Sequence, residues 1–277
     1  ACVNMLYCCK PVITMSKLLI APWGCPARWG RARYVFNGEE ECCTSLVPLL
    51  RGIGSGETTV AVLILDSLVD VFGGQPADSP CAKCYGDFSR VLESVASASS
   101  YTELYEHCRI FGENVVKCIM EGYGVEPKSL KVLVCPSVGS PGGAWRFEGY
   151  ARDFEAVALY ELGKLCLEEE YSEVVLDLTH GVNFMPATCL RLASLLASIL
   201  LVAHGIDGGV KVSVYNSDPY PPGAGRAIPR LNLNLVLAER VRTIYLLHDL
   251  PRELAKANEK LEAEARRTLK AINSGYV

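Results

Sequence analysis

The stretch EVVLDLTHGVNFMP, residues 173–186, joins an apolar strand to an apolar helix through a cluster of hydrogen-bonding groups. Residues 173–178 contain an apolar run without polar–apolar alternation, which is typical of a strand covered on both faces in a parallel sheet. Residues 184–204 leave only a narrow polar stripe, which predicts a nearly buried helix, with a second subunit as one way to bury it. The polar side chains between strand and helix are those of Asp177, Thr179, His180 and Asn183.

The same alternation of strand and helix recurs along the chain and predicts the fold class. Helical periodicity is clearest at residues 152–170 and 184–204. Alternating strands and helices favour an α/β fold with a doubly wound, mainly parallel sheet, and ligands bind such sheets beyond the carboxyl ends of the strands. The expected strands are residues 17–22, 58–65, 130–136, 173–178, 210–216 and 231–239.

These patterns also give the expected domain organisation. We predict one globular unit at residues 16–235, with residues 1–14 outside it. Residues 67–129 are expected to form a helical insertion or a long helical crossover, with helices near 87–98 and 102–121. Residues 236–277 have a charged helical pattern and are expected to be a linker or the start of an effector domain.

Composition restricts the classes of partner. The chain has 277 residues, is 50% hydrophobic and has a net charge of −4, so it can bury a sizeable core but gives no electrostatic footprint for long DNA or RNA. A small anionic ligand stays open, because helix N-termini bind phosphate without a basic surface. The longest apolar run, residues 192–205, is read as too short to cross a membrane and is expected to be a buried helix.

Thirteen cysteines are many for an intracellular protein. The chain is too long for a small disulfide scaffold and begins without a secretory pattern, so we expect a cytoplasmic protein. A thermophilic source would fit both intracellular disulfides and the single glutamine, Gln75. Zinc needs four ligands, so Cys81 and Cys84 would need further ligands from distant parts of the chain. We therefore expect a disulfide or free thiols at this motif, and no metal. The distant candidates are Cys42, Cys43 and Cys108.

The turn after residue 178 has the features of an anion-binding strand–helix junction. Gly181 allows positive φ or a close backbone approach, Asn183 is a plausible N-cap, and Pro186 is tolerated in the first helical turn. The helix N-terminus would then present free N–H groups to a phosphate. The alternative is that the polar side chains only satisfy the hydrogen bonds of the turn.

Other loops offer weaker candidates. Trp23, after the first strand, could stack on a base, and Gly24 would let the backbone approach a ligand; equally, Trp23 could be core or dimer packing. Thr44 or Ser45 is expected to cap a helix that stops at Gly52. The glycine-rich stretch at 135–145 does not match the dinucleotide fingerprint, and we find no P-loop or nucleophile elbow, which disfavours a metabolic nucleotide enzyme.

Two motifs together resemble a known family. LIAPWG at residues 19–24 and Asp-Leu-Thr-His-Gly at residues 177–181, followed by Asn183, resemble the CRISPR-associated Rossmann-fold (CARF) sensors, in the branch named for its Asp-x-Thr-His-Gly motif. The resemblance covers roughly residues 16–235. It implies a Rossmann-like homodimer that binds a cyclic oligoadenylate, most often the tetramer, across its two-fold axis.

The resemblance also implies a set of ligand-binding residues. Asp177 is expected to orient the turn rather than touch the ligand, because a carboxylate next to phosphate is unfavourable. Ser45 and Ser137, from neighbouring loops, complete the candidate set. The positions that match the family's motifs are Trp23, Gly24, Cys25, Thr179, His180, Gly181 and Asn183.

The expected function is therefore that of a sensor domain in type III CRISPR antiviral signalling, without a cofactor. Relatives usually continue into a helical HEPN ribonuclease domain that the ligand activates, whereas this sequence has one or two helices after residue 236, so effector catalysis does not carry over. The alternative is a stand-alone ring nuclease that opens the cyclic oligoadenylate, with His180 and Ser137 as candidates to assist and no assigned catalytic residue.

Overall fold

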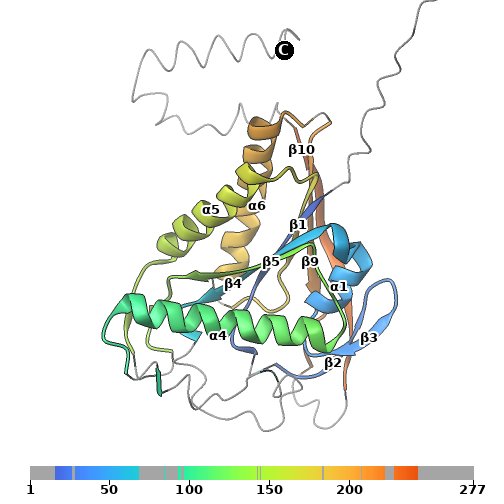
Figure 1. Ribbon diagram of the computed structural model, residues 1–277. Coiled ribbons are helices and arrows are strands. Elements are labelled where there is room, and N and C mark those ends of the chain that lie inside the picture. Colours follow the sequence, from blue (N-terminus) through green and yellow to red (C-terminus); the bar gives the residue numbers. More distant parts are fainter. Residues whose placement is uncertain are drawn as a thin grey trace, which may run out of the picture.

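An eight-stranded sheet with helices packed on both faces forms the centre of the protein (Figure 1). It is seen in a computed structural model that describes residues 16–26, 29–68, 84, 93–94, 97–141, 143, 145–182, 184–206, 208–221 and 228–242. Residues 1–14, and most of the helix expected near 87–98, lie outside the described residues. The α/β class and the Rossmann-like architecture predicted from the sequence are confirmed.

Five parallel strands make the core of this sheet, and all five were predicted from their unbroken apolar runs. Both faces of these strands are buried: Leu19 and Val60 face one hydrophobic cluster, while Leu18 and Ile20 face another. That burial explains why the runs lack alternation. In spatial order the strands are β9 (Val210–Ser217), β8 (Glu173–Asp177), β1 (Lys17–Pro22), β4 (Thr58–Leu65) and β5 (Ser129–Cys135).

The sheet continues beyond β9 with mixed pairing. The strand β10 (Arg230–Val241) runs antiparallel to β9 and passes residue 235, where the globular unit was expected to end. Next to it lie β2 (Ala32–Val35), parallel to β10, and β3 (Glu39–Cys42), antiparallel to β2. Neither β2 nor β3 was predicted. A small separate sheet pairs β6 (Val138–Gly139) with β7 (Phe147–Glu148).

Each face of the sheet is covered by its own helices. One hydrophobic cluster includes residues of α1 (Leu46–Ile53), which a short 3₁₀ turn at Ser55–Glu57 follows, and of α4 (Tyr101–Gly122). The other includes residues of α5 (Ala151–Glu168) and α6 (Met185–His204). Because β4 and β5 are parallel neighbours, α4 belongs to the crossover between them. The expected stop at Gly52 is wrong: Gly52 lies inside α1, and Gly54, with φ of 96°, ends it.

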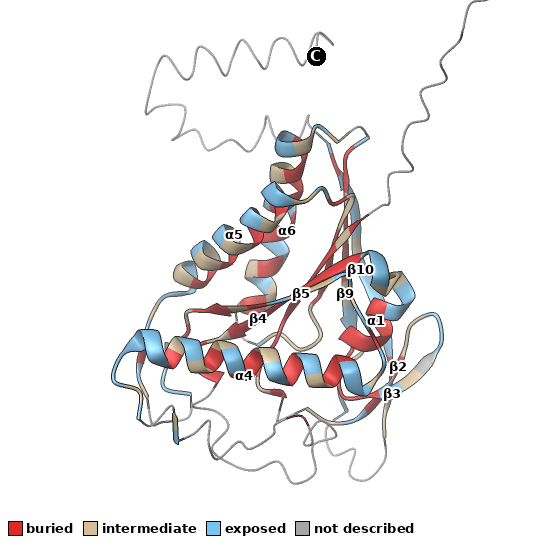
Figure 2. Cartoon of the chain, viewed as in Figure 1, coloured by how far each residue is buried: buried red, intermediate tan, exposed pale blue. Residues whose placement is uncertain are grey.

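Helix α6 is buried on one side only. Leu192, Leu196 and Leu200 face the sheet with at most 1% of their surface exposed, whereas Val202 is 77% exposed. In Figure 2 the red, buried positions of α6 alternate with tan and pale blue ones. At 20 residues, α6 is long and apolar enough by length and composition to cross a membrane. The apolar run at residues 192–205 is the second part of this longer helix, and the prediction of a buried helix holds for its sheet-facing side alone.

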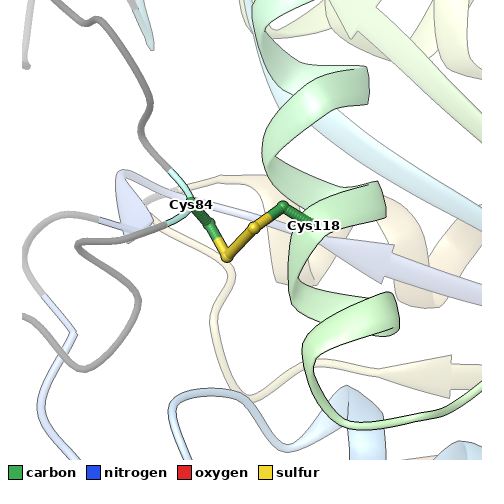
Figure 3. The surroundings of a disulfide bond; sticks show 2 residues. All are labelled: Cys84 and Cys118. Atoms are coloured by element: carbon green, nitrogen blue, oxygen red, sulfur yellow. A yellow bond between two sulfur atoms is a disulfide. The ribbon is translucent and has the colours of Figure 1, made fainter.

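One half of the Cys81–Cys84 motif forms a disulfide with α4. Cys84 is bonded to Cys118, which lies 34 positions further along the chain (Figure 3). This bond makes Cys84 unavailable as a zinc ligand, and Cys43 is also disulfide-bonded. Within the described ranges, no group of three or more His, Cys, Asp or Glu side chains could hold a metal ion. Cys81 lies outside the described residues.

Replacing Leu196 by alanine tests the packing of α6 on the sheet. Leu196 is fully buried, so we expect Leu196→Ala to lower the free energy of unfolding by about 2–5 kcal/mol. Leu235→Ala, at a side chain that is 53% exposed on β10, should cost less than about 1 kcal/mol. Urea denaturation of both variants gives the comparison, and equal losses would contradict this account of α6.

Candidate functional site

The candidate site lies where the order of the parallel strands reverses. From β1 the sheet extends through β4 and β5 to one side, and through β8 and β9 to the other. The loops that follow β1 and β8 therefore meet at the carboxyl edge of the sheet, which is where doubly wound folds bind ligands. The two loops carry the motifs singled out in the sequence. Asn183 lies outside the described residues.

The two loops touch through their glycines. The Gly24 N–H donates a hydrogen bond of 2.8 Å to the carbonyl oxygen of His180. A Cβ atom at Gly24 would lie 2.5 Å from Cγ1 of Val182, and one at Gly181 would lie 2.7 Å from Cγ of Pro186. Close approach, rather than a positive φ, is therefore what requires glycine at both positions.

Asp177 organises the turn from inside the protein. Its side chain is 1% exposed and accepts hydrogen bonds from the Thr179 N–H, at 3.1 Å, and from the Ser45 hydroxyl, at 2.6 Å. Burial raises the pKa of Asp177, and the hydrogen bonds from Ser45 and Thr179 oppose that rise. The Thr179 hydroxyl in turn accepts from the N–H of Ser217 on β9, at 3.2 Å. The prediction that Asp177 orients the turn is confirmed.

Ser45 supports this turn and does not cap α1 through its side chain. The Leu46 N–H finds the hydroxyl of Thr44 instead, at 3.2 Å. Ser45 is fully buried and its hydroxyl is used by Asp177, which corrects its assignment as a ligand contact. The Ser45 N–H also donates to Nε2 of His180, at 3.2 Å. Ser45 thus donates hydrogen bonds to both Asp177 and His180. The sequence around Ser45 did not predict this role.

His180 is a neutral, half-buried ring in this arrangement. It stacks on Trp29 with ring centroids 3.8 Å apart, and the Tyr34 hydroxyl lies 3.4 Å from its Nε2. Because Nε2 accepts the Ser45 N–H, the ring proton belongs on Nδ1. Burial lowers the pKa of His180 from 6.5 to about 3. The imidazole is therefore a weak base that serves as a hydrogen-bond acceptor.

Trp23 is part of the core, which corrects its assignment as a base-stacking residue. Its side chain is 1% exposed and meets the edge of Trp29, with centroids 4.9 Å apart and planes at 87°. The core-packing alternative is therefore the right one for Trp23. Cys25, in the same loop, is half-buried and stays a candidate contact.

Ser137 belongs to a second polar cluster on the same edge, beyond the ends of β4 and β5. Its N–H and hydroxyl both donate to Oδ1 of the buried Asp66, at 3.0 and 2.5 Å, and Tyr101 donates to Oδ2 at 2.7 Å. Ser137 is 2% exposed and does not join the turn after β8, so its assignment as a ligand contact stays a prediction. A cavity of about 460 Å³ lies beside this cluster, lined in part by Trp145. Asp66 follows a buried strand in the sequence, as Asp177 ends one, but it was not predicted as a site residue.

The groups left open to solvent suit binding better than catalysis. Thr179, His180 and Gly181 are half-buried, and Val182 is 37% exposed. Helix α6 starts at Met185, and Phe184 at its N-cap position makes no side-chain capping hydrogen bond. A 20-residue helix carries partial positive charge at such an end, which favours an anion.

The contact between the two loops predicts a rescue. Gly24→Ala should destabilise the protein by about 1–3 kcal/mol, because the new methyl group overlaps Val182. Gly24→Ala combined with Val182→Ala should recover most of that loss, since the overlapping atom is removed. Chemical denaturation of the two single variants and of the double variant gives the double-mutant cycle. Strictly additive losses would show that the two loops do not touch.

The state of His180 predicts a pH dependence of stability. In the unfolded chain His180 binds a proton near pH 6.5, whereas in the folded protein its pKa is lowered to about 3. The unfolded state therefore binds more protons between these values, and the folded state loses stability as the pH falls below 6.5. The loss should approach about 1.4 kcal/mol per pH unit. His180→Gln keeps an acceptor for the Ser45 N–H and should flatten this decline. Urea midpoints at pH 7 and about pH 5 measure it, and parallel declines in the two proteins would contradict the assignment.

Comparison with known proteins shows the family of this chain. The chain matches the family described as CRISPR system endoribonuclease Csx1, CARF domain, over residues 18–219. It is 33% identical over 228 residues to the CRISPR system endoribonuclease Csx1 of Methanocaldococcus jannaschii, covering 80% of this chain. The matched part is 40% of the relative's length, so the chain spans less than half of that protein. The match includes the loops after β1 and β8. The chain therefore belongs to the CRISPR-associated Csx1 CARF-domain family.

Proposed function

We propose that this protein is a sensor domain that binds a cyclic oligoadenylate, with cyclic tetra-adenylate as the first candidate, in type III CRISPR antiviral signalling. The observation that carries the proposal is the turn at residues 179–182. It stands between the β1 loop and the N-terminus of α6, at the switch point of the sheet, in a member of the CARF family.

The local chemistry supports an anionic ligand although the whole chain is acidic. A net charge of −4 offers no attraction at long range, so the ligand's phosphates would be held by nearby N–H dipoles. The N-terminus of α6 supplies a helix dipole, but Pro186 has no N–H and the Met185 N–H donates to the Val182 carbonyl oxygen, so the remaining N–H groups of the turn would complete the site. The buried Asp177 carboxylate accepts hydrogen bonds from Ser45 and Thr179. Thr179, His180 and Gly181 would line the ring, with Cys25 on the facing loop and Asn183 next to them in the chain.

A cyclic ligand with two-fold symmetry suits a site shared by two identical chains. We therefore propose that a homodimer forms the complete site and acts in the cytoplasm. The relative from Methanocaldococcus jannaschii is a CRISPR system endoribonuclease. By analogy with it, we propose that this domain regulates a ribonuclease domain when the two are joined.

Ring cleavage is the weaker function for this site. In-line cleavage would need a base near the ribose 2′-hydroxyl, and His180 is a weak base whose Nε2 is already hydrogen-bonded. Ser137, the second candidate, is bonded to Asp66 away from the turn. Incubating labelled cyclic tetra-adenylate with the protein and separating the products by thin-layer chromatography would detect cleavage.

A carboxylate placed on the turn should repel the ligand. Val182 is 37% exposed beside the α6 N-terminus, so we expect Val182→Asp to weaken the binding of cyclic tetra-adenylate by about tenfold or more. Isothermal titration calorimetry on the full chain measures the dissociation constant. The matched control is Val236→Asp on β10, where the side chain is 64% exposed.

The two variants distinguish specific from general effects. Equal weakening by Val182→Asp and Val236→Asp would indicate a general charge effect and contradict the placement of the site. Absence of binding by the wild-type chain at micromolar ligand would contradict the proposed function itself.

A further inference from the structure

Two aromatic side chains lie beside the turn at residues 179–182, on the side of the β1 loop. Trp29 is half-buried in that loop, and Tyr220, three residues after the end of β9, is 47% exposed. We call them the Trp29/Tyr220 platform. A Cβ atom at Gly30 would lie 2.4 Å from the Tyr220 hydroxyl oxygen, and this hydroxyl donates to the Arg31 carbonyl oxygen at 3.4 Å. Tyr220 therefore packs against the backbone that directly follows Trp29.

The indole of Trp29 is held in place by rings on two sides. It stacks on the imidazole of His180, with centroids 3.8 Å apart and planes inclined by 27°. Trp23 meets it at 87°, with centroids 4.9 Å apart. The first contact fixes the plane of the indole, and the second limits its movement within that plane. A side chain ordered in advance loses little further conformational freedom when a ligand binds, which favours affinity.

Burial distinguishes the two tryptophans of this loop. Trp23 is 1% exposed and belongs to the core, as described above. Trp29 is only half-buried, so part of its ring reaches the surface beside the turn that carries His180. Single-stranded and looped nucleic acids are commonly bound by stacking their bases on partly exposed aromatic rings of this kind. Trp29 therefore has the property that the sequence suggested for Trp23.

The contacts of His180 indicate that its ring acts through Trp29. One face of the imidazole is covered by the indole, and Nε2 accepts the Ser45 N–H at 3.2 Å. The Tyr34 hydroxyl lies 3.4 Å from the same nitrogen. What the imidazole offers to Trp29 is a flat surface behind the indole. His180 thus connects the hydrogen-bond network of Asp177 to Trp29.

We propose that the Trp29/Tyr220 platform stacks on a base of the ligand, that Trp29 makes the main contact, and that His180 is a positioning residue for Trp29. The inference rests on the proposed function, because the base belongs to the cyclic oligoadenylate at the turn. It goes beyond that function by assigning base recognition to two residues outside the motifs at 19–24 and 177–181. Stacking uses the π-face of the base, so the two fused rings of a purine are favoured over a pyrimidine.

Isothermal titration calorimetry of the full chain with cyclic tetra-adenylate tests the contact. Trp29→Ala should weaken binding by about tenfold to a hundredfold, whereas Trp29→Phe keeps an aromatic ring and should stay within about fivefold of wild type. Tyr220→Ala should weaken binding by about threefold or more. The matched control is Trp145→Ala, at a half-buried tryptophan that lines the cavity beside Asp66, and it should bind as wild type does.

Fluorescence provides a readout that a loss of stability would not imitate. The chain has three tryptophans, Trp23, Trp29 and Trp145. A base stacked on Trp29 should quench its emission, so Trp29→Phe should lose most of the ligand-induced quenching while still binding the ligand. Trp145→Phe should keep the quenching. Quenching that persists in Trp29→Phe would contradict the proposal, even if Trp29→Ala fails to fold.

A double-mutant cycle tests the role of His180. His180→Gln keeps an acceptor for the Ser45 N–H but removes the ring behind Trp29. It should weaken ligand binding in the wild-type chain and have little further effect in Trp29→Ala, because both changes remove the same contact. Fully additive losses in the double variant would contradict the positioning role of His180.

A linear ligand separates this inference from the proposed function. Cyclic tetra-adenylate that binds wild type, Trp29→Ala and Tyr220→Ala equally would leave the function standing and overturn the platform. Tighter binding by Trp29→Ala would also overturn it, since the indole would then cover the site. A wild-type chain that binds linear tetra-adenylate with quenching of Trp29, but never the ring, would support the platform and contradict the function. Binding of neither ligand would overturn both.

Discussion

The hydrogen bonds of the buried Asp177 carboxylate are the interaction on which the candidate site depends. This side chain ends β8, and it connects the start of α1, through Ser45, to the turn after the strand, through Thr179. A buried carboxylate is costly unless its oxygens are satisfied, so both groups must be in place together. Ser45 then positions His180, and the His180 carbonyl receives the Gly24 N–H. One buried side chain thereby links two loops and the start of a helix.

The groups of the turn that this hydrogen-bond network does not use determine how a ligand could bind there. Both titratable side chains of the network are already engaged: Asp177 is buried and hydrogen-bonded, and burial lowers the pKa of His180, which stacks on Trp29. The backbone of the turn and the start of α6 face the carboxyl edge, where dipoles rather than side-chain charges would hold a phosphate. A turn held in this way by internal hydrogen bonds is suited to recognition.

The parts of the fold that were predictable are those that depend on local pattern. The parallel strands are apolar throughout because both faces are covered, as for Leu18 and Leu19 on β1. β3 was missed because its run of glutamates resembles a loop when read alone. The sequence around Trp23 does not indicate whether its side chain is buried or exposed. The hydrogen bond between Ser45 and His180 joins residues 135 positions apart. No local pattern shows such long-range pairs, so the supporting residues of the site required the three-dimensional structure.

The central claim is that two chains share one cyclic ligand between their turns. Native mass spectrometry of the full chain with cyclic tetra-adenylate measures this stoichiometry directly. The account predicts a complex of two chains, each of 30.1 kDa, with a single ring bound. A complex of one ring with one chain, or chains that stay unliganded at saturating ring concentrations, would contradict it.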